Sequence, residues 1–244
     1  MAEAIADVEH WLAGARAAAR PAEEVLAWAI RTFRPRIALA SSFGAEDVVL
    51  IDMWWRIDPA VRVFTLDTGR LAEETYEVMD RIRERYGIAV VAYFPGAAAV
   101  EALERERGFY SFRRSVAERK HCCGIRKVEP LGRALADLDA WMTGLRREQA
   151  GTRAAVQQVE RDPAHAGILK VNPLAEWSTA QTWEYIRAHE VPYNRLHDHG
   201  YPSIGCAPCT RAIRPGEDLR AGRWWWERPE SKECGLHLAP AEER

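Results

Sequence analysis

Residues 36–70, RIALASSFGAEDVVLIDMWWRIDPAVRVFTLDTGR, decide the fold class of this chain. RIALASSF (36–43) is a short apolar run that stops at two serines and a glycine, as a buried strand does. In the following GAEDVVLIDMWWRI the apolar residues crowd at helical spacing, and VRVFTLD (61–67) is a second strand that ends at Asp67. The stretch therefore predicts a strand, a helix and another strand.

The same alternation continues along the chain. IAVVAYFP (88–95) predicts a third strand, and further strands are expected near 140–147 and 167–174. A capping box that begins at Ser178 predicts a helix from Thr179. One helical face before the third strand is shared by Leu71, Thr75, Val78, Met79, Ile82 and Tyr86. We therefore expect an α/β fold, a mostly parallel sheet with helices on both faces and ligands beyond the carboxyl ends of the strands.

Charge and composition exclude several classes of protein. The 34 Lys and Arg residues nearly balance 36 Asp and Glu residues, and the formal net charge of −2 gives no general basic field for nucleic acid or a membrane. The N-terminal twenty residues carry acids and bases throughout, unlike a signal peptide, and no apolar run approaches transmembrane length. We expect a soluble cytoplasmic protein, in which five cysteines favour metal or redox chemistry over disulfides.

The composition changes after about residue 200, where Gly, Pro, Cys, Arg and Trp become frequent. We expect one large α/β domain over 1–215 and an irregular, mobile tail over 216–244. Three consecutive tryptophans, Trp224 to Trp226, are more typical of packing or of a subunit contact than of a cofactor site.

The segment SSFGAED places two hydroxyls and a glycine between a strand and a helix. Free backbone N–H groups and the helix dipole can hold an anion at such a turn. An ordinary strand-to-helix turn with serine as the helix cap explains the same residues, and the sequence leaves both interpretations open.

Four cysteines form a possible metal site: the adjacent pair Cys122 and Cys123, and Cys206 with Cys209 in a CAPC segment. Four thiolates suit zinc or a four-iron cluster. Adjacent cysteines are unusual for tetrahedral zinc, so an iron-sulfur cluster is favoured, with zinc and plain core cysteines as alternatives. The cations around the first pair either compensate a cluster and hold an anionic substrate or form a solvated face: Arg119, Lys120, His121, Arg126 and Lys127.

The fifth cysteine, Cys234, lies in the polar stretch KECGLH near the C-terminus. Lys232 and His237 give it a local field that favours the thiolate, so it can act as a nucleophile; an inert exposed cysteine is the alternative. Arg220 and Arg223 precede it, and guanidinium groups bind sulfate and phosphate oxygens.

Taken together, SSFGAED, LDTGR, HCCGIRKVEPL, TGLRREQ, GCAPCT and KECGLH resemble the assimilatory adenylyl-sulfate reductase family of sulfate assimilation, over about 36–238. The resemblance implies an adenine-nucleotide α-hydrolase-like (PP-loop type) fold and one 4Fe-4S cluster per chain on the four paired cysteines. It also implies that Cys234 takes the sulfonate of adenosine 5′-phosphosulfate and that an external thioredoxin then releases sulfite. A homo-oligomer is expected as well.

Residue by residue, the family's substrate-facing lysine falls on Lys127, its arginine pair on Arg220 and Arg223, and the histidine after the nucleophile on His237. The resemblance places the adenosine and phosphate contacts on Ser41, Ser42, Gly44, Asp47, Leu66, Thr68 and Gly144, with Arg146 and Arg147 as additions. The domain over 1–215 would then bind the nucleotide and the cluster, and the tail would carry the catalytic cysteine.

Three other functions remain open at this point. The sister family reduces the 3′-phosphorylated substrate, although most of its members lack both cysteine pairs. PP-loop enzymes that thiolate transfer RNA carry clusters on a related fold, but the net charge and the KECGLH tail oppose that interpretation. A binding module with structural zinc is the third.

Overall fold

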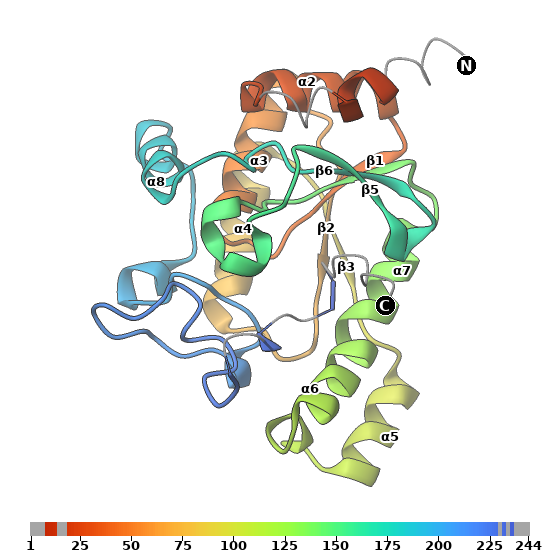
Figure 1. The fold of residues 1–244 in the computed structure, drawn as a ribbon, viewed down its shortest axis with the longest axis vertical. Coiled ribbons are helices and arrows are strands. Elements are labelled where there is room, and N and C mark those ends of the chain that lie inside the picture. The colour runs from red at the N-terminus through yellow and green to blue at the C-terminus, as the bar shows by residue number, and fades with distance from the viewer. Residues whose placement is uncertain (1–7, 14–18, 229–230, 233–234, 237–244) are drawn as a thin grey trace.

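The computed structural model describes residues 8–13, 19–228, 231–232 and 235–236. Its centre is a six-stranded sheet of order β3-β2-β1-β4-β6-β5 (Figure 1). The strands are β1 (Ile37–Ala40), β2 (Val63–Leu66), β3 (Val90–Tyr93), β4 (Ala140–Met142), β5 (Val159–Asp162) and β6 (Ile168–Val171). All neighbours are parallel except β5, which pairs antiparallel with β6. The mostly parallel α/β sheet predicted from the sequence is confirmed.

Helices cover both faces of the sheet because the strands alternate apolar side chains between the faces. Ile37 and Leu39 of β1 join the large core, whereas Ala38 between them joins a second core on the other face. The large core packs against α2 (Ala22–Phe33), α3 (Ala45–Ile57), α4 (Glu73–Tyr86) and α8 (Thr179–Ala188). The second core packs against α7 (Glu129–Leu135).

Two predicted details of these helices are confirmed. The α4 face that the sequence indicated is buried, with Thr75, Val78, Met79, Ile82 and Tyr86 turned inward. Helix α8 begins at Thr179 behind the complete capping box of Ser178 and Gln181.

A third, smaller core lies beside α5 (Ala97–Arg107) and α6 (Val116–Cys123), at the end of the molecule away from α2 (Figure 1). Leu103, Phe112 and Cys122 form it. Helix α6 continues through a π-helical turn, Gly124–Val128, into α7. This wide turn holds Arg126 and Lys127, and such turns are frequent at functional sites.

The boundary expected between residues 215 and 216 falls inside a hydrogen-bonded segment. Thr210 and Arg223 form an antiparallel bridge, and the backbone N–H of Trp224 donates to the carbonyl of Cys209 at 3.1 Å. The described part of the tail therefore packs on the domain, and its mobility stays a prediction. Within the described ranges, no helix is both long and apolar enough to cross a membrane.

Candidate active site

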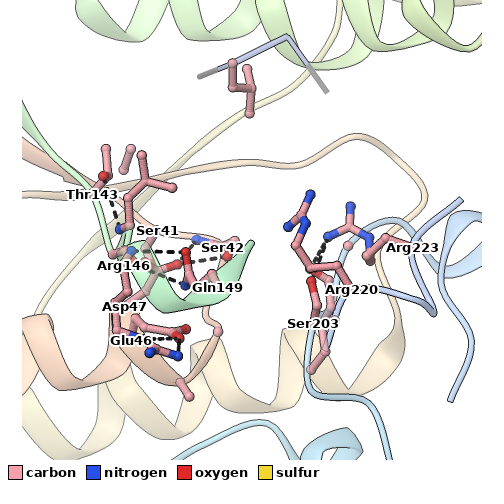
Figure 2. Close-up of a pocket in the computed structure, with 18 of the residues that line it drawn as sticks. Ser41, Ser42, Glu46, Asp47, Thr143, Arg146, Gln149, Ser203, Arg220 and Arg223 are labelled. Carbon is pink, nitrogen blue, oxygen red and sulfur yellow. Dashed lines mark hydrogen bonds and ion pairs between the residues drawn. The ribbon is translucent and has the colours of Figure 1, made fainter. Parts of the chain in front are cut away.

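A cavity of about 240 Å³ opens beyond the carboxyl ends of the parallel strands (Figure 2). Its walls come from the loops after β1, β2 and β4, from α7 and its preceding π turn, and from the segment that contains Ser203 and Arg223. The cavity gathers most of the residues that the sequence indicated as substrate contacts: Ser41, Ser42, Gly44, Asp47, Leu66, Thr68, Lys127, Gly144, Arg146, Arg220 and Arg223.

Arg147 is not among the lining residues. Its guanidinium is 2.7 Å from a carboxylate oxygen of Glu176 and donates to the carbonyl of Val156 at 2.7 Å. A substrate contact by Arg147 stays a prediction that this geometry does not support.

The loop after β1 is tied together by Asp47. The backbone N–H and the hydroxyl of Ser42 both donate to one oxygen of its carboxylate, at 2.6 and 2.8 Å. Burial raises the pKa of Asp47 to about 6, although the hydrogen bonds from Ser42 act in the opposite direction. The N-cap of α3 is Gly44, and no side chain caps the helix there, so the serine-cap interpretation does not hold.

Gly144, in the loop after β4, lies directly against this carboxylate. A Cβ atom at position 144 would lie 2.4 Å from Oδ1 of Asp47 and 2.8 Å from the Cβ of Glu46. Only a residue without a side chain lets the two loops approach this closely.

Gly144→Ala is therefore expected to destabilise the protein by about 1–3 kcal/mol, because the methyl group overpacks a site whose neighbours cannot move away freely. Denaturant unfolding measures the change. Gly132→Ala in α7 is the matched control: a Cβ there meets nothing within 4 Å, so stability should stay equal or rise. Equal stability of Gly144→Ala and wild type would show that the close approach is not fixed.

Arg146 is a buried wall of the cavity rather than a free cation. Its guanidinium lies 2.8 Å from Glu46 and 3.0 Å from Glu148, and it also donates to the carbonyl of Trp177 at 3.0 Å. Two carboxylates, of which Figure 2 shows Glu46, already balance its charge, so an anionic ligand would compete with them.

The opposite wall is cationic and tightly held. Arg223 is buried, and it donates to the carbonyl of Ile204 at 3.1 Å and approaches the hydroxyl of Ser203 at 3.4 Å (Figure 2). A Cβ at Gly205 would lie 2.2 Å from the guanidinium of Arg223, so the glycine allows this position. Arg220, also buried, donates to the carbonyl of Lys232 at 2.9 Å.

A second, smaller cavity is lined by all four paired cysteines, Cys122, Cys123, Cys206 and Cys209. Cations surround them: Arg70, Arg119, Arg126, Lys127 and Arg223. Lys127, Arg223 and Trp224 line both cavities. The two cavities therefore share one wall, and two of its three side chains are cationic.

The thiols of this group differ in their electrostatics. Burial raises the pKa of Cys206, but the charge of Lys127, a 3.3 Å contact with the Thr68 hydroxyl and the charge of Arg223 outweigh it, and the net pKa is lowered. Burial raises the pKa of Cys209 to about 12. Burial likewise raises the pKa of Cys122.

The donor set fits a cluster in chemistry, since four thiolates and their cluster carry negative charge and the cavity has cations around it. In the part of the chain that the structure describes, no three His, Cys, Asp or Glu side chains lie so that they could hold one metal ion. The thiols thus do not form a compact single-ion site here, and the 4Fe-4S cofactor stays a prediction.

Cys234 and His237 lie outside the described residues. Two described residues near them have contacts: the Lys232 ammonium donates to the carbonyl of Ala221, also in the tail, at 3.2 Å, and Leu236 lines the large cavity. Of the described residues that flank position 234, Leu236 lies at the cavity and the carbonyl of Lys232 accepts a hydrogen bond from Arg220 of the cavity wall.

Sequence reasoning missed several lining residues. Glu46 is next to Asp47 in the SSFGAED segment, which the sequence had indicated as a candidate binding turn, so its place in that motif could have predicted that it lines the cavity. Burial lowers the pKa of His197, and neither ring nitrogen has a hydrogen-bond partner among the described residues. Nothing in the local sequence separated His197 from the surface histidines near it.

The fold and this site together define an α/β nucleotide-binding enzyme with its ligand cavity at the carboxyl ends of the strands. The sequence model of the phosphoadenosine phosphosulfate reductase domain matches residues 36–212, and the chain belongs to that family. The resemblance that the motifs indicated is confirmed.

Relatives agree with this assignment. An adenosine 5′-phosphosulfate reductase of Burkholderia cepacia is 54% identical over 203 residues, which cover 83% of this chain and 81% of that protein. One of Pseudomonas aeruginosa is 48% identical over 220 residues, 88% of this chain and 81% of that protein. A probable chloroplastic 5′-adenylylsulfate reductase 1 of rice is 46% identical over 88% of this chain, which spans 46% of the plant protein.

Solved structures show the same fold. The phosphoadenylyl-sulfate reductase of Candida auris, in a phosphate complex, superposes with a TM-score of 0.67 at 30% identity and covers 80% of this chain and 91% of its own. The FMN adenylyltransferase of Candida glabrata superposes with a TM-score of 0.55 at 13% identity, over 87% of this chain and 73% of its own, and this similarity concerns the fold alone.

Proposed function

We propose that this protein reduces adenosine 5′-phosphosulfate to sulfite and AMP, with thioredoxin as the external electron donor. The observation that carries the proposal is the shared wall: Lys127 and Arg223 line both the large cavity and the cysteine cavity. A substrate with two adjoining anionic groups needs cations at one end of a nucleotide-sized cavity. The relatives named for this activity support it.

The reaction takes place in two displacements. In the first, the Cys234 thiolate attacks the sulfate sulfur, a sulfur–sulfur bond forms, and the sulfur–oxygen bond to the phosphate breaks. AMP leaves with that electron pair, and S-sulfocysteine remains. In the second, a thioredoxin thiolate attacks the Cys234 sulfur and sulfite departs with the bonding electrons. The second thiol of thioredoxin then resolves the mixed disulfide and frees Cys234, so the dithiol supplies both electrons.

The cations act on the leaving group. Lys127, Arg220 and Arg223 would neutralise the phosphate and sulfate on binding and stabilise the charge that builds on the departing phosphate. The buried positions of both arginines strengthen this effect, because water screens them little. His237, next to the nucleophile in sequence, would help to position or ionise it.

Cys122, Cys123, Cys206 and Cys209 would hold the 4Fe-4S cluster. When bound, the cluster would supply negative charge and local order beside Lys127 rather than relay electrons, because both electrons arrive as thiols. Lys127 would then lie between two anionic groups and orient the substrate toward the shared wall.

Protein purified without oxygen is expected to be brown and to contain about four irons and four sulfides per chain, because four cysteines line one cavity. Iron, sulfide and zinc analysis measures this. Cys206→Ala should lose the iron, whereas Cys234→Ser should retain it. Stoichiometric zinc without iron would contradict the cluster.

The protein is also expected to prefer adenosine 5′-phosphosulfate to its 3′-phosphorylated relative. The paired cysteines match the family that uses the former, and the reported relatives above 45% identity carry its name. Sulfite release with each nucleotide and thioredoxin gives the ratio of kcat/KM values. Equal or reversed values would assign this chain to the sister activity.

A further inference from the structure

A buried ion pair joins the cysteine-bearing helix α6 to the tail. The side chains of Arg119 and Glu227 are 0% and 3% exposed. Nε and one terminal nitrogen of Arg119 donate to the two carboxylate oxygens of Glu227, each at 2.9 Å. The same terminal nitrogen donates to the carbonyl of Ser231 at 2.6 Å, and the Ser231 hydroxyl donates to Glu227 at 3.0 Å. We call these three residues the tail clasp.

General stability does not account for the tail clasp. Removing two charges from water costs as much as their attraction returns in many proteins, and apolar residues of similar size often serve as well. A fully buried bidentate ion pair is nevertheless specific in geometry, because the two parallel N–H groups of the guanidinium fit only one orientation of the carboxylate. The arrangement therefore favours a role in fixing the position of the tail.

The location of the tail clasp connects it with both parts of the proposed site. Arg119 lies one helical turn before Cys122 and Cys123 on α6. Its guanidinium lies 4.6 Å from the centre of the Trp224 ring, and that of Arg223 lies 4.7 Å from the same ring. Trp224 and Arg223 line both cavities, so the tail clasp lies next to the shared wall without lining the large cavity itself.

We propose that Arg119 and Glu227 are positioning residues that anchor the tail at Glu227 and Ser231, which we call its root, so that Cys234 is delivered to the nucleotide cavity. This inference rests on the proposed function. Ser231 is three residues before Cys234, so an anchored root limits the reach of the thiol to about 10 Å. If the loss of the tail clasp also frees Lys232 from Arg220 and Ala221, the tail leaves from the buried Trp224, ten residues before Cys234, and the reach becomes about 35 Å.

The loss of the anchor should lower the effective concentration of the thiol at the substrate. Effective concentration falls roughly as the −3/2 power of tether length, so a change from three to ten residues lowers it about sixfold. The effect belongs to the attack step and not to nucleotide binding, because neither Arg119 nor Glu227 lines the large cavity.

The test uses the double variant Arg119→Met/Glu227→Leu, which removes the pair without leaving a buried charge. Enzyme saturated with adenosine 5′-phosphosulfate, without thioredoxin, is quenched over time, and the sulfonate on Cys234 is measured by mass spectrometry. Because Arg119 also lines the cysteine cavity, the rate is counted per iron-containing chain, and we expect sulfonate formation up to about sixfold slower than in wild type, with unchanged affinity for AMP. Arg119→Lys, which keeps the charge but not the fork, should fall between the two.

Glu118→Gln is the matched control. Glu118 is the neighbour of Arg119 on α6, and its ion pair with Arg107 is partly exposed, at 24% and 43%. This variant should react at the wild-type rate. If the double variant does not fold, Glu227→Asp, which draws the carboxylate back from Arg119 by one methylene group, is measured in the same way.

Alkylation of Cys234 by iodoacetamide in the resting enzyme gives a second readout that does not depend on the sulfonucleotide. If the root of the tail is no longer anchored, Cys234 should be alkylated faster while sulfonate forms on it more slowly. A general structural defect would not change these two rates in opposite directions. Wild-type values of both rates in a folded variant, or an iron loss that matches the rate loss, would overturn the inference. Absence of any sulfonate on Cys234 in wild type would instead refute the proposed function, and alkylation would still test the tail clasp.

Discussion

Cys234→Ser is expected to abolish sulfite release altogether. A serine hydroxyl is not ionised near neutral pH and is a far weaker nucleophile than a thiolate. Even if it reacted, it would form a sulfate ester, from which a thiol cannot release sulfite by thiol–disulfide exchange. The measurement is sulfite production with adenosine 5′-phosphosulfate and thioredoxin.

The same variant should keep its other properties, because the strands of the sheet and the paired cysteines of the second cavity are formed by other residues. Iron content and AMP affinity should equal those of wild type. Steady sulfite production by the serine variant would remove Cys234 from the mechanism, whereas loss of the iron would show that its role is structural.

Arg223→Ala is expected to lower kcat/KM by about a hundredfold or more, because a contact to a developing oxyanion is typically worth roughly 3 kcal/mol. The guanidinium is buried in the shared wall, held by Ile204, and faces both cavities. Steady-state kinetics with thioredoxin in excess measure the loss, and iron analysis checks that the cysteine cavity is intact.

Arg147→Ala is the control for that experiment, since the sequence also indicated Arg147 as a substrate contact but its partners are Glu176 and Val156 rather than the cavity. It should retain near-wild-type kinetics. Wild-type kinetics in Arg223→Ala would show that the buried arginine supports only the packing of Trp224.

Much of the sheet was predictable because its parallel strands are short apolar runs with functional loops behind them. Residues 36–70 contain two such strands, and the loops after them do reach one cavity. The antiparallel strand β5 was missed because its sequence, VERD, has two charged residues between the buried Val159 and Asp162. Asp162 is buried as the acceptor of the Trp141 indole at 3.1 Å, a contact that no local pattern indicates.

The candidate site was predictable where the motif itself lines the cavity, and less so where a distant partner decides the role. Arg146 and Arg147 are equivalent in sequence, yet Glu46, a hundred residues away, turns one into a cavity wall and the fold directs the other elsewhere. The pairing of Arg119 with Glu227 spans 108 residues. Pairings of this range depend on the finished fold, so the sequence around Arg119 reads only as a basic helix.

The central claim is that Cys234 takes the sulfonate before any reductant acts, and one measurement tests it directly. Wild-type protein is incubated with adenosine 5′-phosphosulfate and no thioredoxin, and its intact mass is recorded before peptide mapping. We expect a mass increase of one SO₃ group per chain, located on Cys234, and its disappearance with sulfite release once thioredoxin is added. An unmodified protein, or an adduct on any other cysteine, would contradict the account.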